Sequence, residues 1–263
     1  ALIFFFFFTL ASFGIGSSVQ SNTVALAVEN SLGVDPWLTG IVITAFSALV
    51  ILGGIKSISK ASSVIVPVMA IGYILGGLAI ILSNLELVLP ALKMIVSYAF
   101  TGEAALGGAV GAAIRYGVAR GVFSNEAGMG SAPIAAAAAK TDHPARQGLV
   151  SMTGTFIDTI IVCSITGIVL VMGFIMADNN FGEHTGAVLT IHIFDQLLPG
   201  IGGWVVTFGI IFFAYSTILG WSYYGEKCAT YLLGEKFVLP YRIIYIISVF
   251  IGCVATLDLV WLF

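Results

Sequence analysis

Long apolar runs separated by short polar breaks dominate the chain. A helix needs roughly 17–25 predominantly apolar residues to cross the hydrocarbon core of a bilayer. The runs and their breaks predict seven membrane-spanning helices: 2–31, 37–54, 61–83, 107–140, 147–176, 201–232 and 239–260. No hinge or polar linker divides them, so residues 1–263 are predicted to form one all-α transmembrane domain.

Two further apolar runs are too short to span. Residues 86–100 and 187–198 are each below the spanning length. Both are predicted to form short helices that lie on the protein surface or at the membrane interface. For 187–198, a re-entrant helix is the alternative.

The segment 107–140 is much longer than one span, and it cannot be a continuous helix. Its middle reads Phe-Ser-Asn-Glu-Ala-Gly-Met-Gly over residues 123–130, followed by Ser131 and Pro133. Glycines, amides and a carboxylate at membrane depth are tolerated only where the backbone lines a cavity or is buried in protein. We therefore predict a discontinuous helix, which is typical of a transporter binding site.

The composition places the chain in a membrane. It is 59% hydrophobic and only 9% charged, with a mean hydropathy of +1.08, whereas soluble domains carry about 25% charged residues. The net charge of −3 gives no indication of a nucleic-acid partner. Cys163, Cys228 and Cys253 lack metal-ligand spacing and are predicted to be small buried hydrophobic residues.

The ends of the chain and its charged loops add two expectations. The apolar start and end predict a fragment of a larger protein and not a signal peptide. Basic residues follow the second, fourth and sixth spans: Lys56, Lys60, Lys140, Arg146, Lys227, Lys236 and Arg242. The alternate loops are acidic, with Lys93 as their one base. The positive-inside rule places the basic loops in the cytoplasm.

The two helix ends at the break could bind a zwitterion. The preceding helix would end near Phe123 with unpaired carbonyls, and the following helix would start near Gly130, with Ser131 as its N-cap. An ammonium group would face the carbonyls and a carboxylate the amides. Gly128 and Gly130 would allow a ligand to approach the backbone. The alternative is a kink packed against neighbouring helices.

Two carboxylates at membrane depth are candidate coupling or structural acids. Glu126 could assist cation binding, or it could cap the second half-helix or pair with Arg115 or Arg120; a structural cap or ion pair is favoured. Asp158 lies near the middle of the span 147–176. It could couple transport to a proton or cation, or be a structural acid hydrogen-bonded by a neighbouring threonine, Thr155 or Thr159.

Polar side chains in two other spans are further candidates. Gln20 and Asn22 must form hydrogen bonds within a membrane, either between helices or to a polar ligand. Ser216 and Thr217 follow Phe213 by three and four residues, so their hydroxyls share a face with its carbonyl. These oxygens suit a hard cation, although such hydroxyls commonly bond back to their own helix.

Signals of an enzyme are missing. The sequence contains no phosphate-binding loop, no zinc-protease motif and no nucleophile elbow. His143, His184 and His192 fall in loops or interfacial segments and are predicted to be solvated or structural.

The run from Arg120 to Ile134, with Gln20-Ser-Asn22 upstream, resembles the alanine/glycine:cation symporter family. The resemblance implies a LeuT-type fold of two inverted five-helix repeats, with the chain supplying about helices three to nine. It also implies symport of alanine or glycine with sodium by alternating access. Sodium would be cargo and no cofactor is expected. The protein would lie in the cytoplasmic membrane of a prokaryote, as a multi-pass protein in the lipid bilayer.

The resemblance also implies roles for individual residues. The substrate would contact Gln20 or Asn22 and the break, where the candidates are Phe123, Ser124, Asn125, Gly128 and Gly130. Phe213, Ser216 and Thr217 match the spacing of eighth-helix sodium ligands in that fold. The first broken helix, which would supply the other half of both sites, has no counterpart in the chain.

Two alternatives to sodium symport remain open. The same fold could use protons, with Asp158 or Glu126 as the relay. The chain could instead be a truncated, non-transporting scaffold, in which the break has no cavity and Gly128→Leu would leave ligand binding and assembly unchanged.

Overall fold

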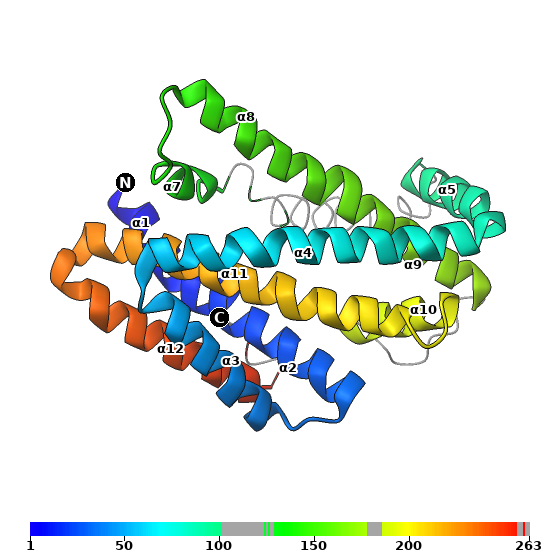
Figure 1. Ribbon diagram of the computed structural model, residues 1–263, viewed down its shortest axis with the longest axis horizontal. Helices are drawn as coiled ribbons and strands as arrows, with labels where there is room; N and C mark the ends of the chain where they lie inside the picture. Colours follow the sequence, from blue (N-terminus) through cyan, green and yellow to red (C-terminus); the bar gives the residue numbers. More distant parts are fainter. Residues whose placement is uncertain (101–123, 125, 127–128, 178–185, 257–259, 261–263) are drawn as a thin grey trace. The chain divides into compact units, whose positions relative to one another are not determined.

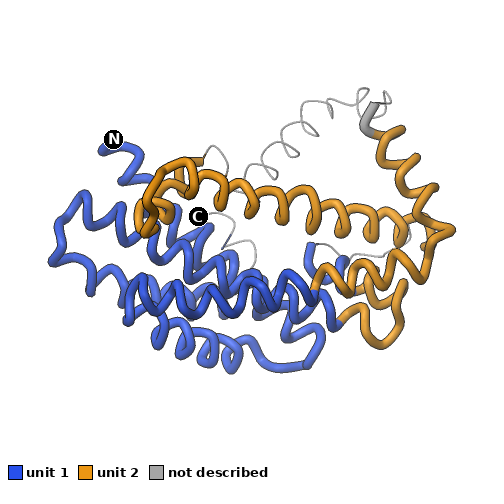
Figure 2. Tube along the Cα trace, turned by 45° about the horizontal axis from the view of Figure 1, so that its top comes forward, with its two compact units in different colours: residues 1–72, 185–191, 204–263 blue, residues 73–184, 192–203 orange. Residues whose placement is uncertain are grey.

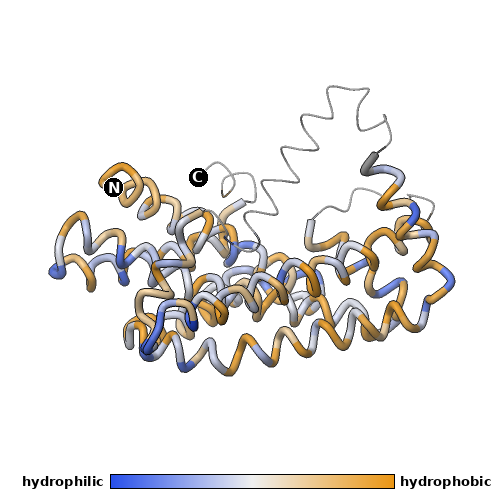
Figure 3. The backbone as a smooth tube through the Cα atoms, turned by 90° about the horizontal axis from the view of Figure 1, so that it is seen from above, coloured by the Kyte–Doolittle hydropathy of each residue, from blue (hydrophilic) through white to orange (hydrophobic). Residues whose placement is uncertain are grey.

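The computed structural model describes residues 1–100, 124, 126, 129–177, 186–256 and 260, and these form helices, turns and loops without a strand. The predicted all-α fold is confirmed for this part of the chain. Figure 3 shows that hydrophilic positions gather mainly near the turns and helix ends, as expected for helices in a bilayer. The described residues divide into two compact units (Figure 2).

Unit 1 comprises residues 1–72, 185–191 and 204–263. Its first helix is continuous from Leu2 to Leu32 but changes type along its length. It begins as α1 (Leu2–Ala11), widens to the π-helix η1 (Ser12–Ser18) and ends as α2 (Val19–Leu32). α3 (Pro36–Ile51) follows, with Asp35 capping its first turn through a 2.7 Å bond from the Trp37 amide.

Three longer elements complete unit 1. They are α4 (Gly54–Ser83), α11 (Gly202–Leu233) and, after the short 3₁₀ helix η3 (Glu235–Phe237), α12 (Val238–Val254). Residues 73–83 of α4 and the first two residues of α11 belong to unit 2, as does the second half of α10 (Gly186–Leu197). Figure 1 shows α12 beside α2 and α3, and these helices are in contact.

Small residues allow close helix packing in unit 1. A Cβ on Gly252 of α12 would lie 2.5 Å from the Cα of Ser18. Ser17 and Ser248 share a hydrogen bond of 2.8 Å, as do Ser12 and Tyr241. Contacts between small residues are the usual means of joining membrane helices, because lipid provides no hydrophobic force between them.

Unit 2 comprises residues 73–184 and 192–203, of which 101–123, 125, 127–128 and 178–184 are not described. It contains α5 (Leu85–Phe100), α7 (Ala132–Ala136) and a long helix made of α8 (Pro144–Thr155), the π-helix η2 (Phe156–Cys163) and α9 (Ser164–Met176). α5 packs against α9. The buried residues include Val169, Met172, Ile193 and Phe194, and Tyr73 donates to or accepts from Thr166 at 2.7 Å.

Several predicted boundaries need correction. Among the described residues, five helices are long and apolar enough to span: 2–32, 54–83, 144–176, 202–233 and 235–254. The predicted span 37–54 is the shorter helix α3, because the chain turns at Gly54, whose φ of +68° ends the segment. That turn also moves the start of the next helix from 61 to Gly54. The short helices predicted at 86–100 and 187–198 are α5 and α10.

Only part of the discontinuous segment 107–140 falls within the described residues. Residues 129–131 are not helical, as a break requires. The helix after them, α7, is a five-residue turn of helix that ends at Ala136 and buries none of its side chains. A second half-helix reaching Lys140 was therefore a wrong prediction. The sequence of five consecutive alanines favours helix locally, but the chain turns before Pro144.

Candidate functional site

The break is shaped by two residues in left-handed conformation. Glu126 has a φ of +57° and Gly130 a φ of +85°. Glycine adopts this conformation freely, but a glutamate does so at a cost. The Met129 amide donates to the Glu126 carbonyl at 3.2 Å, which closes a turn. An acidic residue in a strained backbone conformation marks this turn as a candidate functional position.

The Ser131 side chain bonds another residue of the break and does not cap the following helix. It occupies the N-cap position of α7, yet no side-chain cap is formed. Its buried hydroxyl instead donates to the Glu126 carboxylate at 2.7 Å. Ser131 therefore occupies the predicted N-cap position but forms no capping bond, and α7 is too short to develop much dipole for a substrate carboxylate. Arg115 and Arg120 lie outside the described residues, so their predicted pairing with Glu126 stays a prediction.

Ser124 connects the break to the middle of the next long helix. Its hydroxyl donates to Oδ2 of Asp158 at 2.7 Å, and Thr159 donates to the same oxygen at 3.2 Å. The sulfur of Cys163 lies 3.5 Å from Ser124 Oγ. Asp158 is thus hydrogen-bonded by Thr159, one of the two predicted partners. Cys163 is exposed among the described residues, so the buried environment predicted for it is wrong, whereas Cys228 and Cys253 are buried as predicted.

Asp158 lies where the helix geometry is irregular. Asp158 belongs to η2, in which the helix widens over Phe156–Cys163. π-helical segments are rare and occur often at functional sites. The sequence carries no clear signal for η2, since Phe-Ile-Asp-Thr-Ile-Ile-Val-Cys is compatible with an ordinary helix.

In unit 1, the structure separates the roles of Gln20 and Asn22. Asn22 is 2% exposed, and its Nδ2 donates to the carbonyls of Gly252 at 3.1 Å and Ala255 at 2.8 Å. Those carbonyls lie at the end of α12, so Asn22 joins two helices and satisfies a helix terminus. Gln20 is half-buried and donates within its own helix, to the Ile15 carbonyl at 3.2 Å.

The hydrogen bond from the Gln20 side chain to the Ile15 carbonyl follows the geometry of the preceding π-helix η1. At the end of η1 the Val19 amide pairs with the Gly14 carbonyl, five residues earlier. The Gln20 amide side chain bonds a carbonyl at the same separation. Gly14 and Gly16 are the sequence features that could have indicated this irregular helix, because glycine weakens a regular α-helix.

The candidate cation-binding oxygens of α11 are engaged within their own helix. The hydroxyls of Ser216 and Thr217 donate to the Phe213 carbonyl at 2.8 and 2.9 Å. Such bonds to the same helix are the common alternative to a cation site. The arrangement still brings three oxygens together on one face of α11, and each hydroxyl oxygen keeps lone pairs for a further contact.

Contacts between the first helix and α11 place Gln20 level with Thr217. Gly16 packs on Trp221, and Ser31 bonds Thr207 at 2.6 Å, so the two helices are antiparallel. Gln20 follows Gly16 by four residues, and Thr217 precedes Trp221 by four. Equal rise along both helices brings the two to the same height. The candidate substrate residue and the candidate cation residues of unit 1 therefore share one level.

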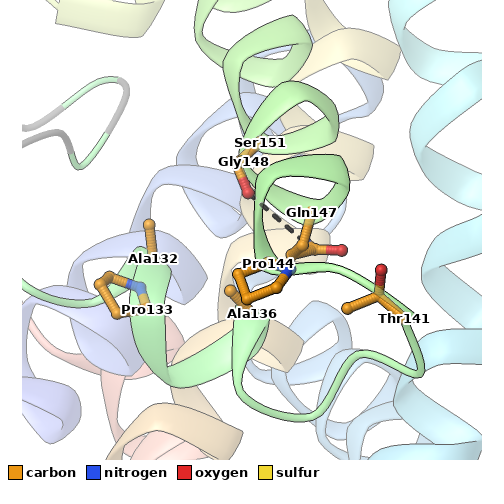
Figure 4. A pocket seen from close by; sticks show the side chains of 8 residues that line it. All are labelled: Ala132, Pro133, Ala136, Thr141, Pro144, Gln147, Gly148 and Ser151. Carbon is orange, nitrogen blue, oxygen red and sulfur yellow. Dashed lines mark hydrogen bonds between the residues drawn. The ribbon is translucent and has the colours of Figure 1, made fainter.

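Three candidate substrate residues and one pocket add nothing to the geometry of the candidate site. Phe123, Asn125 and Gly128 lie outside the described residues. A pocket of about 480 Å³ lies between α7 and α8 (Figure 4). It is lined by Ala132, Pro133, Ala136, Thr141, Pro144, Gln147, Gly148 and Ser151. None of these residues was predicted to bind substrate, and the pocket has no charged side chain for a zwitterion.

A sequence model of the sodium:alanine symporter family matches residues 1–263. The chain belongs to this family. Members of the sodium:alanine symporter family are transporters and not enzymes, and the apolar helices agree with a multi-pass membrane protein.

Relatives agree with the family assignment. The sodium/alanine symporter AgcS of Methanococcus maripaludis is 58% identical over 258 residues, which is 98% of this chain and 57% of AgcS. A Bacillus subtilis protein named probable sodium/glutamine symporter GlnT is 40% identical over 256 residues, or 95% of this chain and 52% of GlnT. The sodium/proton-dependent alanine carrier protein of Bacillus sp. PS3 is 32% identical over 261 residues, or 92% and 58%. The chain spans about half the length of these relatives.

Proposed function

We propose that the protein containing this chain carries alanine or glycine across the cytoplasmic membrane together with sodium, by alternating access. The observation that carries this proposal is the non-helical turn at 129–131. Ser131 of this turn bonds the Glu126 carboxylate, while Ser124 bonds Asp158 of the next long helix. A fixed interruption at membrane depth supplies backbone groups and side-chain oxygens to a polar ligand.

Within this proposal, the break forms one half of the substrate site. Ser124 and the residues around Gly128 and Gly130 would approach the amino acid, and glycines leave room only for a small side chain. Gln20 is the contact from the first helix, because Asn22 is already committed to the end of α12. Phe123 and Asn125 complete the proposed set.

Sodium is proposed to bind the oxygens of Phe213, Ser216 and Thr217, together with groups from outside this chain. Hard cations prefer oxygen ligands, and a carbonyl with two hydroxyls provides three without a fixed charge. The hydroxyl protons now point to the Phe213 carbonyl. Sodium binding would turn them away, so that all three oxygens face the ion.

Proton coupling is the second candidate function. It is favoured by Asp158, a carboxylate that accepts hydrogen bonds from two hydroxyls in the middle of a span, and by the name of the sodium/proton-dependent carrier of Bacillus sp. PS3. Glu126 is the other acid that could act as a relay. A carboxylate that gives up and regains a proton during the cycle would make uptake depend on the pH gradient.

Uptake by the full-length protein in proteoliposomes distinguishes these candidates. Labelled alanine should accumulate when sodium is higher outside, and collapse of the pH gradient should leave the rate unchanged. Accumulation that ignores sodium and stops with the pH gradient would support the proton relay. Absence of both uptake and alanine binding would favour the scaffold. Unlabelled glycine should compete with alanine, and glutamine should compete less because of its longer side chain.

A further inference from the structure

Four exposed lysines lie at one end of unit 1. Lys56 and Lys60 are in the first two turns of α4, Lys227 is in the last two turns of α11, and Lys236 is in η3. The lysines come from segments that are distant in sequence. Their clustering therefore depends on how the helix ends are held together.

Arg242 of α12 holds these helix ends together. Its Nε donates to Oε2 of Glu226 at 2.6 Å, and its Nη1 donates to the Leu52 carbonyl at 2.9 Å. Glu226 directly precedes Lys227, and Leu52 precedes Lys56 by four residues. The side chain also packs on Gly54, where a Cβ would lie 2.9 Å from Nη2. One partly buried ion pair and the bond to Leu52 thus hold the ends of α3, α4, α11 and α12 together.

The length of the helices places this end in the headgroup layer. α4 has 30 residues and α11 has 32, which at 1.5 Å per residue gives roughly 45 Å and 48 Å. The hydrocarbon core is about 30 Å thick, and the bilayer with its headgroups about 40–45 Å. Helices of this length cross the core and extend through the headgroups. Lysines in their terminal turns then lie among lipid phosphates.

The charge at this end is positive and not internally balanced. Glu226 is paired with Arg242, so neither contributes a free charge. Four lysines against the exposed carboxylate of Glu235 leave a net charge of +3. In the described part of the chain, no carboxylate lies within ion-pair distance of these four lysines. Lys227 lies 5.4 Å from the ring of Tyr223, and Tyr231 on the same helix end is 58% exposed, as in aromatic interface belts.

We propose that this lysine surface, formed by Lys56, Lys60, Lys227 and Lys236, binds the headgroups of anionic phospholipids. A basic cluster at the cytoplasmic end of membrane helices matches the charge of the anionic leaflet. The contribution of a single lysine corresponds to about a fivefold change in affinity. Removal of two lysines should therefore weaken binding at least tenfold. The proposal does not depend on the identity of the transported solute.

The test uses the full-length protein in a neutral detergent, titrated with phosphatidylglycerol or phosphatidylcholine while the thermal unfolding midpoint is recorded. Phosphatidylglycerol should raise the midpoint, and phosphatidylcholine should not. Lys56→Gln with Lys60→Gln, and Lys227→Gln with Lys236→Gln, should each shift the half-effective phosphatidylglycerol concentration at least tenfold. The control Lys93→Gln removes one exposed charge from a segment predicted to lie on the opposite side of the membrane, and it should shift this concentration less than twofold.

Three results would overturn the proposal. They are an equal effect of the two lipids, an equal shift in the control, and an unchanged response in both test pairs. Millimolar inorganic phosphate should not compete, because a membrane surface presents many phosphates at once. Competition by phosphate would be a fourth result against the proposal, because it would identify a free-anion site instead. Lysine-to-arginine variants at the same positions should keep the response, which separates loss of charge from loss of folding.

Discussion

Ser124 and Asp158 are joined by a hydrogen bond of 2.7 Å from the serine hydroxyl to Oδ2 of the carboxylate. The bond joins a residue of the interrupted segment to the π-helical part of the neighbouring long helix. Thr159 donates to the same oxygen, which leaves Asp158 fixed by two hydroxyls. The position of the break is therefore tied to a carboxylate 34 residues later in the chain.

We expect Asp158→Ala to lower alanine uptake at least tenfold, since Ser124 loses its acceptor and the break loses a fixed position. A hydrogen bond to a charged group contributes about 1.5–3 kcal/mol. Asp158→Asn keeps an acceptor and removes the charge. If Asp158 only positions the break, Asn should restore most uptake. If it relays protons, Asn should be as inactive as Ala, and the pH dependence of the rate should disappear.

Gln20 and Asn22 should respond differently to substitution. Asn22→Ala leaves the carbonyls of Gly252 and Ala255 without their donor, so the unfolding midpoint of the full-length protein should fall, corresponding to about 1–3 kcal/mol. Gln20→Ala should leave the midpoint nearly unchanged and raise the KM for alanine. The reverse pattern, with an unstable Gln20 variant and a kinetic effect only at Asn22, would contradict the assignment of the substrate contact to Gln20.

Thr217→Val removes the hydroxyl with little change of shape and tests the proposed sodium site. The sodium concentration for half-maximal uptake should rise several-fold, because one of three proposed oxygen ligands is lost. Thr217→Ser, which keeps the hydroxyl, should behave as the native protein. Thr207→Ser is a further control on the same helix, since it keeps the bond partner of Ser31. An unchanged sodium response in Thr217→Val would remove Thr217 from the site.

Packing of α12 on the first helix depends on the absence of a side chain at Gly252. A Cβ there would lie 2.5 Å from Ser18 Cα and 2.7 Å from its carbonyl oxygen, and backbone atoms cannot yield easily. Gly252→Ala should destabilise the protein by about 1–3 kcal/mol. Gly72→Ala is the matched control, because nothing lies within 4 Å of its Cβ position. It should leave the unfolding midpoint unchanged or raise it slightly. Equal effects of the two variants would show that the contact is not tight.

The membrane spans could be predicted largely from the sequence because an apolar run must satisfy its backbone as a helix in lipid. Errors arose where local geometry decides the end of a helix. The turn at Gly54 separates α3 from α4, although Leu52 and Ile55 continue the apolar pattern. The alanines after Pro133 would favour a longer helix, but α7 ends at Ala136. The pattern of apolar residues along the chain does not predict such turns.

The sequence could predict which residues of the candidate site are unusual, but not which residues they contact. Asp158 and Glu126 could be named as unusual acids at membrane depth. Their partners, Ser124 and Ser131, could not be assigned, since they depend on the fold around the break. Asn22 and Gln20 have similar side chains and similar positions in sequence. Only the packing of α12 shows that Asn22 has a structural task.

Sodium-driven alanine uptake by the full-length protein tests the central claim most directly. In proteoliposomes with equal pH on both sides, an inward sodium gradient should drive accumulation of labelled alanine above its external concentration, and replacing sodium with potassium should abolish it. Accumulation that is the same in sodium and potassium, or that follows only an imposed pH gradient, would contradict sodium-coupled symport.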